Sequence, residues 1–141
     1  MTDTPLSGRR VLVVGASSGI GAALAKAVVS AGGDVAVSAR RSDRLDALVV
    51  EMSRGHAVPG DTTIPAEARR VADEAAAAMG GLDLMVYVAG YGVLQPLVDT
   101  DPVVWRDVFQ VNVVGANLAT AAALGHLDRT GLVAFISSRT V

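Results

Sequence analysis

Short runs of apolar residues recur along the chain between longer, more polar stretches. These runs are nearly continuous in Val, Leu and Ile, which is typical of parallel strands that are covered on both faces. Four of them lie at residues 11–14, 35–37, 84–88 and 132–136, and a weaker one lies at residues 56–58. We therefore expect five strands.

The stretches between these runs have the spacing of amphipathic helices. The positions that share one helical face are Ile20, Leu24, Ala27, Val28 and Ala31 in the first stretch, and Leu45, Leu48, Val49 and Met52 in the second. Further helices are expected over Pro65–Met79, where proline suits the first turn, and over about residues 102–126. Strands that alternate with helices form βαβ units, so the pattern predicts an α/β domain with helices on both faces of a parallel sheet.

Composition narrows the class of protein. With 51% apolar and 18% charged residues in 141 positions, the chain has the composition of one globular domain. A net charge of -2 without clustered Lys or Arg argues against binding to nucleic acid or to an anionic membrane. The absence of Cys and the wide separation of the two His argue against a metal site. No apolar run is long enough to span a bilayer and the first residues do not resemble a secretory signal, so we expect a soluble cytoplasmic protein.

Three glycines, Gly15, Gly19 and Gly21, fall where the first strand gives way to the first helix. Glycine there allows a positive φ and lets a phosphate approach the backbone without meeting a Cβ atom. The unpaired N–H groups and the positive dipole end of the helix favour an anion, so the turn predicts a diphosphate site. Packing alone is the alternative reason for glycine in such a turn. The lack of a following Gly-Lys-Ser/Thr argues against a loop that binds nucleoside triphosphates.

The second strand ends in Ser38-Ala39-Arg40-Arg41, where a dinucleotide site places the residue that binds the ribose. A carboxylate there would bind the 2′-hydroxyl of NAD, whereas a guanidinium forms paired, charge-assisted hydrogen bonds with a 2′-phosphate. Arg40 therefore favours NADP over NAD, with a solvated position as the alternative. For Arg41 we favour a solvated position at the start of the second helix.

Further motifs follow the predicted strands. They are Gly15-Ala16-Ser17-Ser18-Gly19-Ile20-Gly21 after the first, Gly60-Asp61-Thr62 after the third, Val88-Ala89-Gly90 after the fourth and Ile136-Ser137-Ser138 after the fifth, with Trp105, Val108, Val111, Asn112 and Gly115 in the last helical stretch. In this set the chain resembles the short-chain dehydrogenase/reductase family from about Arg9 to its end. Two positions depart from the family pattern, because Val14 stands in place of Thr and Val88 in place of Asn.

The resemblance implies a fold and a set of site residues. The fold is a three-layer αβα, Rossmann-like, doubly wound parallel sheet with strand order 3-2-1-4-5, truncated after the fifth strand, in a single dinucleotide-binding domain over residues 1–141. The residues implied to bind the cofactor are Gly15, Ser17, Ser18, Gly19, Ile20, Gly21, Arg40, Asp61, Thr62, Ala89 and Gly90. The catalytic residues implied are Asn112, which would hold a water molecule, and Ser138. The structural alternatives are a turn cap for Asp61, an ordinary hydrogen bond for Asn112 and an ordinary serine at a strand end for Ser138. Ser137 is the less favoured candidate for the catalytic serine.

By the same resemblance, the reaction is hydride transfer between a nicotinamide and a small-molecule carbonyl or alcohol, with a Tyr as acid/base and a Lys four residues after it. No such pair is found, since Tyr91 follows Tyr87 at that spacing and Gln95 follows Tyr91. We therefore expect the 141 residues to be the amino-terminal part of a longer reductase, nearly inactive alone, and to form a homo-oligomer. The alternatives are a non-catalytic dinucleotide-binding or scaffolding protein and a methyltransferase, against which Arg40 argues.

Overall fold

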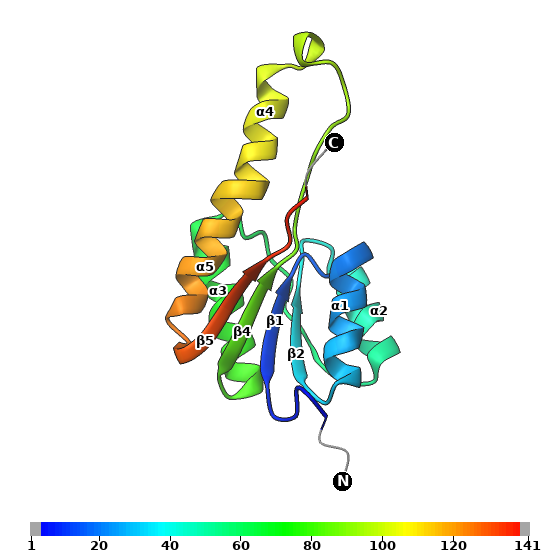
Figure 1. Ribbon diagram of the computed structural model, residues 1–141, viewed down its shortest axis with the longest axis vertical. Coiled ribbons are helices and arrows are strands. Elements are labelled where there is room, and N and C mark those ends of the chain that lie inside the picture. Colours follow the sequence, from blue (N-terminus) through cyan, green and yellow to red (C-terminus); the bar gives the residue numbers. More distant parts are fainter. Residues whose placement is uncertain (1–3, 139–141) are drawn as a thin grey trace.

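Five parallel strands form one sheet in the order β3-β2-β1-β4-β5 (Figure 1). The computed structural model describes residues 4–138. The strands are β1 (Arg10–Val14), β2 (Asp34–Ser38), β3 (His56–Ala57), β4 (Leu82–Tyr87) and β5 (Leu127–Phe135). The α/β class and the strand order predicted from the sequence are confirmed.

Helices cover both faces of the sheet, which gives three layers. One face carries α1 (Gly19–Ser30) and α2 (Ser42–Met52), and the other carries α3 (Pro65–Met79) and α5 (Ala116–Leu124) (Figure 1). Successive side chains of a strand point to opposite faces, so β1 sends Val13 to the α1 side and Leu12 to the α3 side. Two apolar cores therefore share the central strands.

The helical stretch expected over residues 102–126 is divided by a wider turn. The structure has α4 (Pro102–Phe109), then a π-helical turn (Gln110–Gly115), here called the π turn, and then α5, which ends at Leu124. A π-helical turn is closed by hydrogen bonds between residues five apart and inserts an extra residue into the helix, which apolar spacing alone does not reveal. The helical stretch predicted over about residues 102–126 is thus present, but it consists of α4, the π turn and α5 and ends at Leu124.

The two edge strands also differ from their predicted lengths. β5 begins at Leu127, whereas the prediction began it at residue 132. The prediction missed the first part of the strand because residues 128–130 are polar and interrupt the apolar pattern. A strand at the edge of a sheet is partly solvated and therefore needs no continuous apolar run. At the opposite edge, β3 contains only His56 and Ala57.

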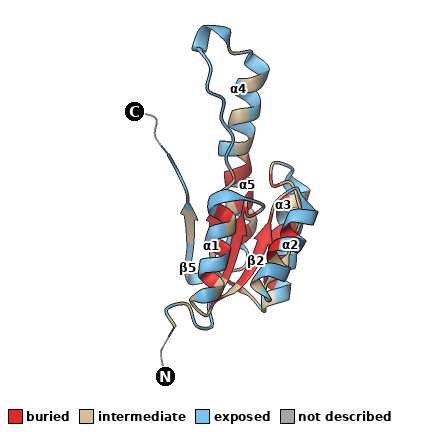
Figure 2. Cartoon of the chain, turned by 90° about the vertical axis from the view of Figure 1, so that its right-hand side faces the viewer, coloured by how far each residue is buried: buried red, intermediate tan, exposed pale blue. Residues whose placement is uncertain are grey.

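Burial is concentrated in the strands and in the helix faces that pack on them, whereas α4 lies mostly beyond the end of the sheet (Figure 2). None of the eight residues of α4 is buried, and Asp101 caps the helix by accepting a hydrogen bond from Val103 N at 2.7 Å. Between residues 4 and 138, the structure has no helix with the length and apolar character needed to cross a membrane.

An ion pair joins the amino-terminal ends of β1 and β4. The carboxylate of Asp83 accepts hydrogen bonds from Arg10 Nε at 2.9 Å, from Arg10 Nη2 at 3.0 Å and from the Arg10 backbone N at 2.8 Å. The side-chain hydrogen bonds from Arg10 hold the pKa of Asp83 at about 2, below its ordinary value of 3.8. Arg10 also donates to the carbonyl of Gly80 at 2.6 Å, so the same guanidinium fixes the turn between α3 and β4.

Candidate functional site

The carboxyl ends of β1, β2 and β4 and the loop after β3 enclose a cavity of about 970 Å³. Open parallel sheets bind ligands at this end, where neighbouring strands send their connections to opposite faces. β1 and β4 are such a pair, because α1 follows β1 on one face and α5 covers β4 on the other. The lining includes every cofactor-binding residue predicted from the sequence: Gly15, Ser17, Ser18, Gly19, Ile20, Gly21, Arg40, Asp61, Thr62, Ala89 and Gly90. The fold thus brings four separate segments together.

Two glycines of the turn after β1 are required by packing. Gly15 has a φ of +96°, and a Cβ there would collide with the backbone of Ala89, with the Cα of Ala89 only 2.7 Å away. A Cβ at Gly21 would collide with the carbonyl group of Gly15, whose carbon would be 2.8 Å away. The packing alternative therefore accounts for these two positions.

Gly19 differs from the other two because it faces open space. Its φ is +54°, and no atom lies within 4 Å of the position that its Cβ would take. Ser18 is the N-cap of α1, but its side chain accepts no hydrogen bond from the N–H groups of the first turn. A helix start that is not capped by its own side chain presents N–H donors to a ligand, and these donors together with the helix dipole favour an anion.

The two arginines after β2 both line the cavity but have different surroundings. Arg40 is exposed. Arg41 Nη2 donates to Ser17 Oγ at 2.8 Å and to Ser18 Oγ at 3.3 Å, so its side chain crosses to the glycine turn. The sequence favours a solvated start of helix for Arg41, and it misses this contact because Ser17 and Arg41 lie far apart along the chain.

The loop after β3 forms its own hydrogen-bonded turn. Asp61 Oδ1 accepts from Thr63 N at 2.9 Å and from Thr63 Oγ1 at 2.7 Å, while the backbone N of Asp61 donates to Glu67 Oε2 at 2.7 Å. Thr62, between these residues, is buried. Asp61 therefore caps a turn and also lines the cavity, so its position is compatible both with a structural role and with contact to a ligand.

The segment after β4 is attached to β1 through the backbone. Both Val88 N and Ala89 N donate to the carbonyl of Val14, at 2.8 and 3.1 Å. The Val88 side chain packs against the apolar core on the α1 side of the sheet. The departure from Asn at this position therefore replaces a polar side chain with an apolar contact.

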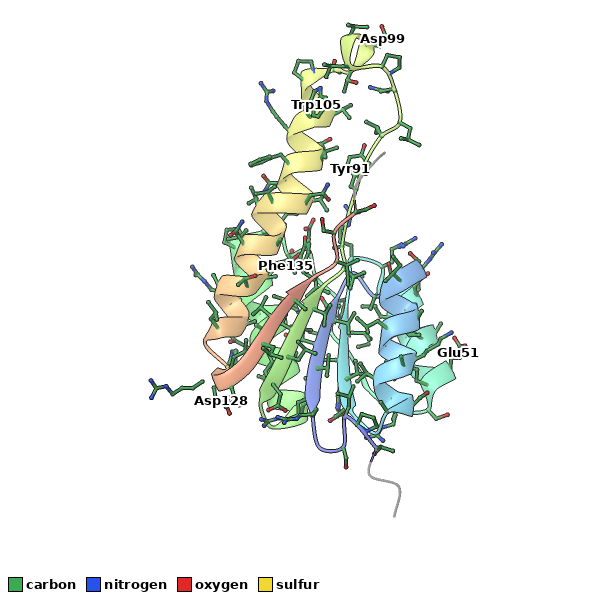
Figure 3. All side chains as sticks on the ribbon, in the orientation of Figure 1. Glu51, Tyr91, Asp99, Trp105, Asp128 and Phe135 are labelled. Atoms are coloured by element: carbon green, nitrogen blue, oxygen red, sulfur yellow. The ribbon has the colours of Figure 1, made fainter. Side chains whose placement is uncertain are left out.

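Asn112 lies in the π turn and binds the backbone of Tyr91 twice. Its Oδ1 accepts from Tyr91 N and its Nδ2 donates to Tyr91 O, each at 2.8 Å. Asn112 does not line the large cavity, but it lines a neighbouring one of about 280 Å³ together with Tyr91 and Trp105. Figure 3 shows Tyr91 on the segment that runs beside α4, and Trp105 near the far end of that helix. The structural hydrogen bond considered for Asn112 is thus present.

Ser138 lies beyond the end of β5 and is exposed, as is Ser137. Within residues 4–138, neither serine lines either cavity. The pairing of β5 with β4 continues only as far as Ile136, whose N donates to Tyr87 O at 3.0 Å. The structure therefore does not bring Ser138 together with Asn112 at one cavity.

Comparison with known proteins identifies the relatives of this chain. Residues 9–141 match the family model for the short chain dehydrogenases. The chain belongs to the short chain dehydrogenase family. It is 40% identical to a short chain dehydrogenase of Pseudocercospora fijiensis, covering 94% of this chain and 46% of that protein. It is 38% identical to glucose 1-dehydrogenase of Gluconobacter oxydans, covering 89% of this chain and 49% of that protein. The chain spans about half the length of these curated relatives.

Solved short chain dehydrogenase structures share its fold. The structure of a short chain dehydrogenase from Burkholderia cenocepacia in complex with NADP superposes with a TM-score of 0.86 at 36% identity, covering 92% of this chain and 55% of that one. A dehydrogenase/reductase from Sinorhizobium meliloti superposes with a TM-score of 0.90 at 32% identity, covering 97% and 56% of the two chains.

Two residues that line the large cavity have no distinct signal in the sequence. Asp107 reaches it from α4 and Gln110 from the π turn, where Gln110 Nε2 donates to the carbonyl of Thr63 at 3.2 Å. Only the course of the π turn places them there. Among residues 4–138, no group of three or more His, Cys, Asp or Glu side chains is arranged to hold a metal ion.

Proposed function

We propose that this chain binds NADP as the cofactor-binding portion of an oxidoreductase that transfers hydride between the nicotinamide and a carbonyl or alcohol carbon. One observation carries the proposal. The large cavity has anion-binding groups in two places, at the uncapped start of α1 beside Gly19 and at the guanidinium groups of Arg40 and Arg41. NADP carries a diphosphate and a separate 2′-phosphate, so its charges match this distribution.

The residues present fit such a cofactor. The turn at Gly19 would hold the diphosphate, because a side chain is absent where a phosphate must approach the backbone. Arg40, with Arg41 beside it, would bind the 2′-phosphate. Asp61 and Thr62 would contact the adenine, and the segment at Ala89 and Gly90 would contact the nicotinamide. The related Burkholderia cenocepacia structure, which contains NADP, supports this choice over NAD.

When bound, the cofactor would exchange hydride with the substrate, and the protein would orient both and move the proton. On the family resemblance we propose Asn112 and Ser138 as the catalytic residues on this chain, although, within residues 4–138, Asn112 lines the smaller cavity and Ser138 lines neither. A Tyr and a Lys four residues after it, as implied by the family resemblance, would complete the site. The substrate class, the cytoplasmic location and the homo-oligomeric state stay predictions.

A second candidate function is dinucleotide binding without catalysis. It is favoured by the position of Ser138, which lines neither of the two cavities in the described part of the chain, whereas every residue predicted to bind the cofactor lines the large one.

The test is titration of the 141-residue chain with NADPH and, separately, with NADH, followed by cofactor fluorescence. We expect saturable binding with NADPH at least about tenfold tighter, the effect of one charge-assisted contact. Failure to bind either cofactor would contradict the proposal. Because we expect the 141 residues to be nearly inactive alone, the reading frame beyond residue 141 separates the two candidates: a Tyr followed four residues later by a Lys, about ten residues on, would decide for the oxidoreductase.

A further inference from the structure

Two hydrogen-bonded contacts tie the π turn to the segment that leaves β4. Tyr87, the last residue of β4, donates its hydroxyl proton to the carbonyl oxygen of Val111 at 2.7 Å. The next residue of the π turn, Asn112, binds both backbone groups of Tyr91. Residues 88–90, which lie between the two tyrosines, line the large cavity. The π turn therefore holds this wall of the cavity at both of its ends.

The fit between Tyr87 and the π turn is close. Tyr87 is only 3% exposed. A Cβ at Gly115 would lie 2.6 Å from its hydroxyl oxygen and 3.3 Å from Thr63 Cγ2, so glycine is what lets the end of the π turn approach the ring. Burial raises the pKa of the Tyr87 hydroxyl above its ordinary value of 10.0, and the group therefore keeps its proton and remains a donor at neutral pH.

We propose that Tyr87 is a positioning residue that fixes the π turn through Val111, so that Asn112 holds residues 88–91 as one wall of the cofactor cavity. For the identity of its ligand this inference rests on the proposed function, whereas the contacts themselves lie within the chain. It also accounts for Val88, because a wall held at Tyr87 and Tyr91 does not need a polar side chain between them. The backbone bonds from Val88 N and Ala89 N to Val14 O complete its support.

The test is the variant Tyr87→Phe in the 141-residue chain, with amide hydrogen exchange followed by NMR. The Tyr91 N–H, which donates to Asn112, should exchange about fivefold to tenfold faster, as expected for the loss of one hydrogen bond. Amides in the middle of β1 and β2, such as those of Val13 and Val37, should keep their wild-type rates. The dissociation constant for NADPH should rise by about the same factor, because the wall is less ordered.

Tyr91→Phe is the matched control, since it removes the same hydroxyl group from the other of the two tyrosines. Asn112 binds only the backbone of Tyr91, so the amide of residue 91 should keep its wild-type exchange rate in this variant. Gly115→Ala perturbs the contact from the opposite side and should reproduce the local acceleration, which gives a second test if Tyr87→Phe does not fold.

Unchanged exchange at residue 91 in Tyr87→Phe would overturn the proposal. Equal acceleration of the strand amides would also overturn it, because that result describes a general loss of stability. A wild-type chain that binds no NADPH, combined with local acceleration in Tyr87→Phe, would contradict the proposed function while supporting the positioning contact.

Discussion

The guanidinium of Arg41 bonds to Ser17 Oγ at 2.8 Å, which ties the start of α2 to the turn that precedes α1. Both arginines are exposed and line the same cavity, but within residues 4–138 Arg40 makes no such bond to the glycine turn. The two arginines therefore differ in what they can do for a bound dinucleotide. Arg41 acts partly on the shape of the glycine turn, whereas the charge of Arg40 is presented to the cavity.

Replacing the two arginines separately should reveal this difference. Arg40→Ala should weaken NADPH binding by about tenfold to a hundredfold, the loss expected for hydrogen bonds to a charged group, and change NADH binding by less than about twofold. Arg41→Ala should weaken both cofactors, because Ser17 and Ser18 lose their partner. Fluorescence titration measures each constant, and Arg44→Ala on the exposed side of α2 is the control. Equal losses for the two cofactors in Arg40→Ala would contradict the assignment of NADP.

The glycines of the turn should separate into binding and packing positions. Gly19→Ala should cost about 1–2 kcal/mol of the free energy of unfolding, the usual penalty for a Cβ in the left-handed region, and should strongly weaken NADPH binding. Gly21→Ala should lower stability further, because its Cβ meets the carbonyl of Gly15. Urea unfolding and NADPH titration of both variants provide the measurements. Wild-type binding by Gly19→Ala would show that the turn does not seat a phosphate.

Restoring the family pattern at Val88 should be unfavourable in this chain. Val88→Asn places an amide against an apolar core and should lower the free energy of unfolding by about 1–3 kcal/mol. Val50→Asn, the same change at a side chain that is 77% exposed, should alter it by less than about 0.5 kcal/mol. Chemical denaturation compares the two. An increase in stability on Val88→Asn would contradict this prediction, because it would mean that an amide at position 88 finds a polar partner.

The ion pair between Arg10 and Asp83 predicts a dependence of stability on pH. The pKa of Asp83 is lower in the folded chain than its ordinary value, so the unfolded chain binds the proton more readily and this contribution is fully present above pH 3.8. It should fade as the pH falls from 3.8 to about 2. Asp83→Asn should therefore be less stable than the wild type at neutral pH, and the difference should shrink over that acidic range.

Thermal unfolding of the wild type, Asp83→Asn and the exposed-site control Asp46→Asn across this range measures the effect. Asp46→Asn should follow the wild type at every pH. A gap between Asp83→Asn and the wild type that stays constant down to pH 2 would show that the carboxylate charge is not the source of the stabilisation.

The ends of the strands could be predicted from the sequence because each is a short local pattern. The glycines after β1 and the arginines after β2 lie next to the strands that place them, and a parallel sheet brings such ends to one edge. The direction of the Arg41 side chain could not be predicted in this way, since it depends on Ser17, which belongs to another turn.

The region around Asn112 shows a second feature that the sequence pattern alone could not predict. Helical periodicity predicts a helix there, but the hydrogen-bond partners of the π turn, Tyr87 and Tyr91, precede it by more than 20 positions. The sequence left a structural hydrogen bond and a catalytic water as alternatives for Asn112, and only the three-dimensional arrangement supplies its partners. The polar start of β5 is missed for a related reason, because pairing with β4 rather than apolar content makes it a strand.

The close contact between Gly15 and Ala89 means that two turns from distant parts of the chain already touch before a ligand arrives. A dinucleotide that enters at this edge would order few protein atoms, and the entropy lost on binding would come mainly from the ligand itself. Recognition of the proposed dinucleotide would then depend on how well the ligand matches a surface that is preorganised at this contact.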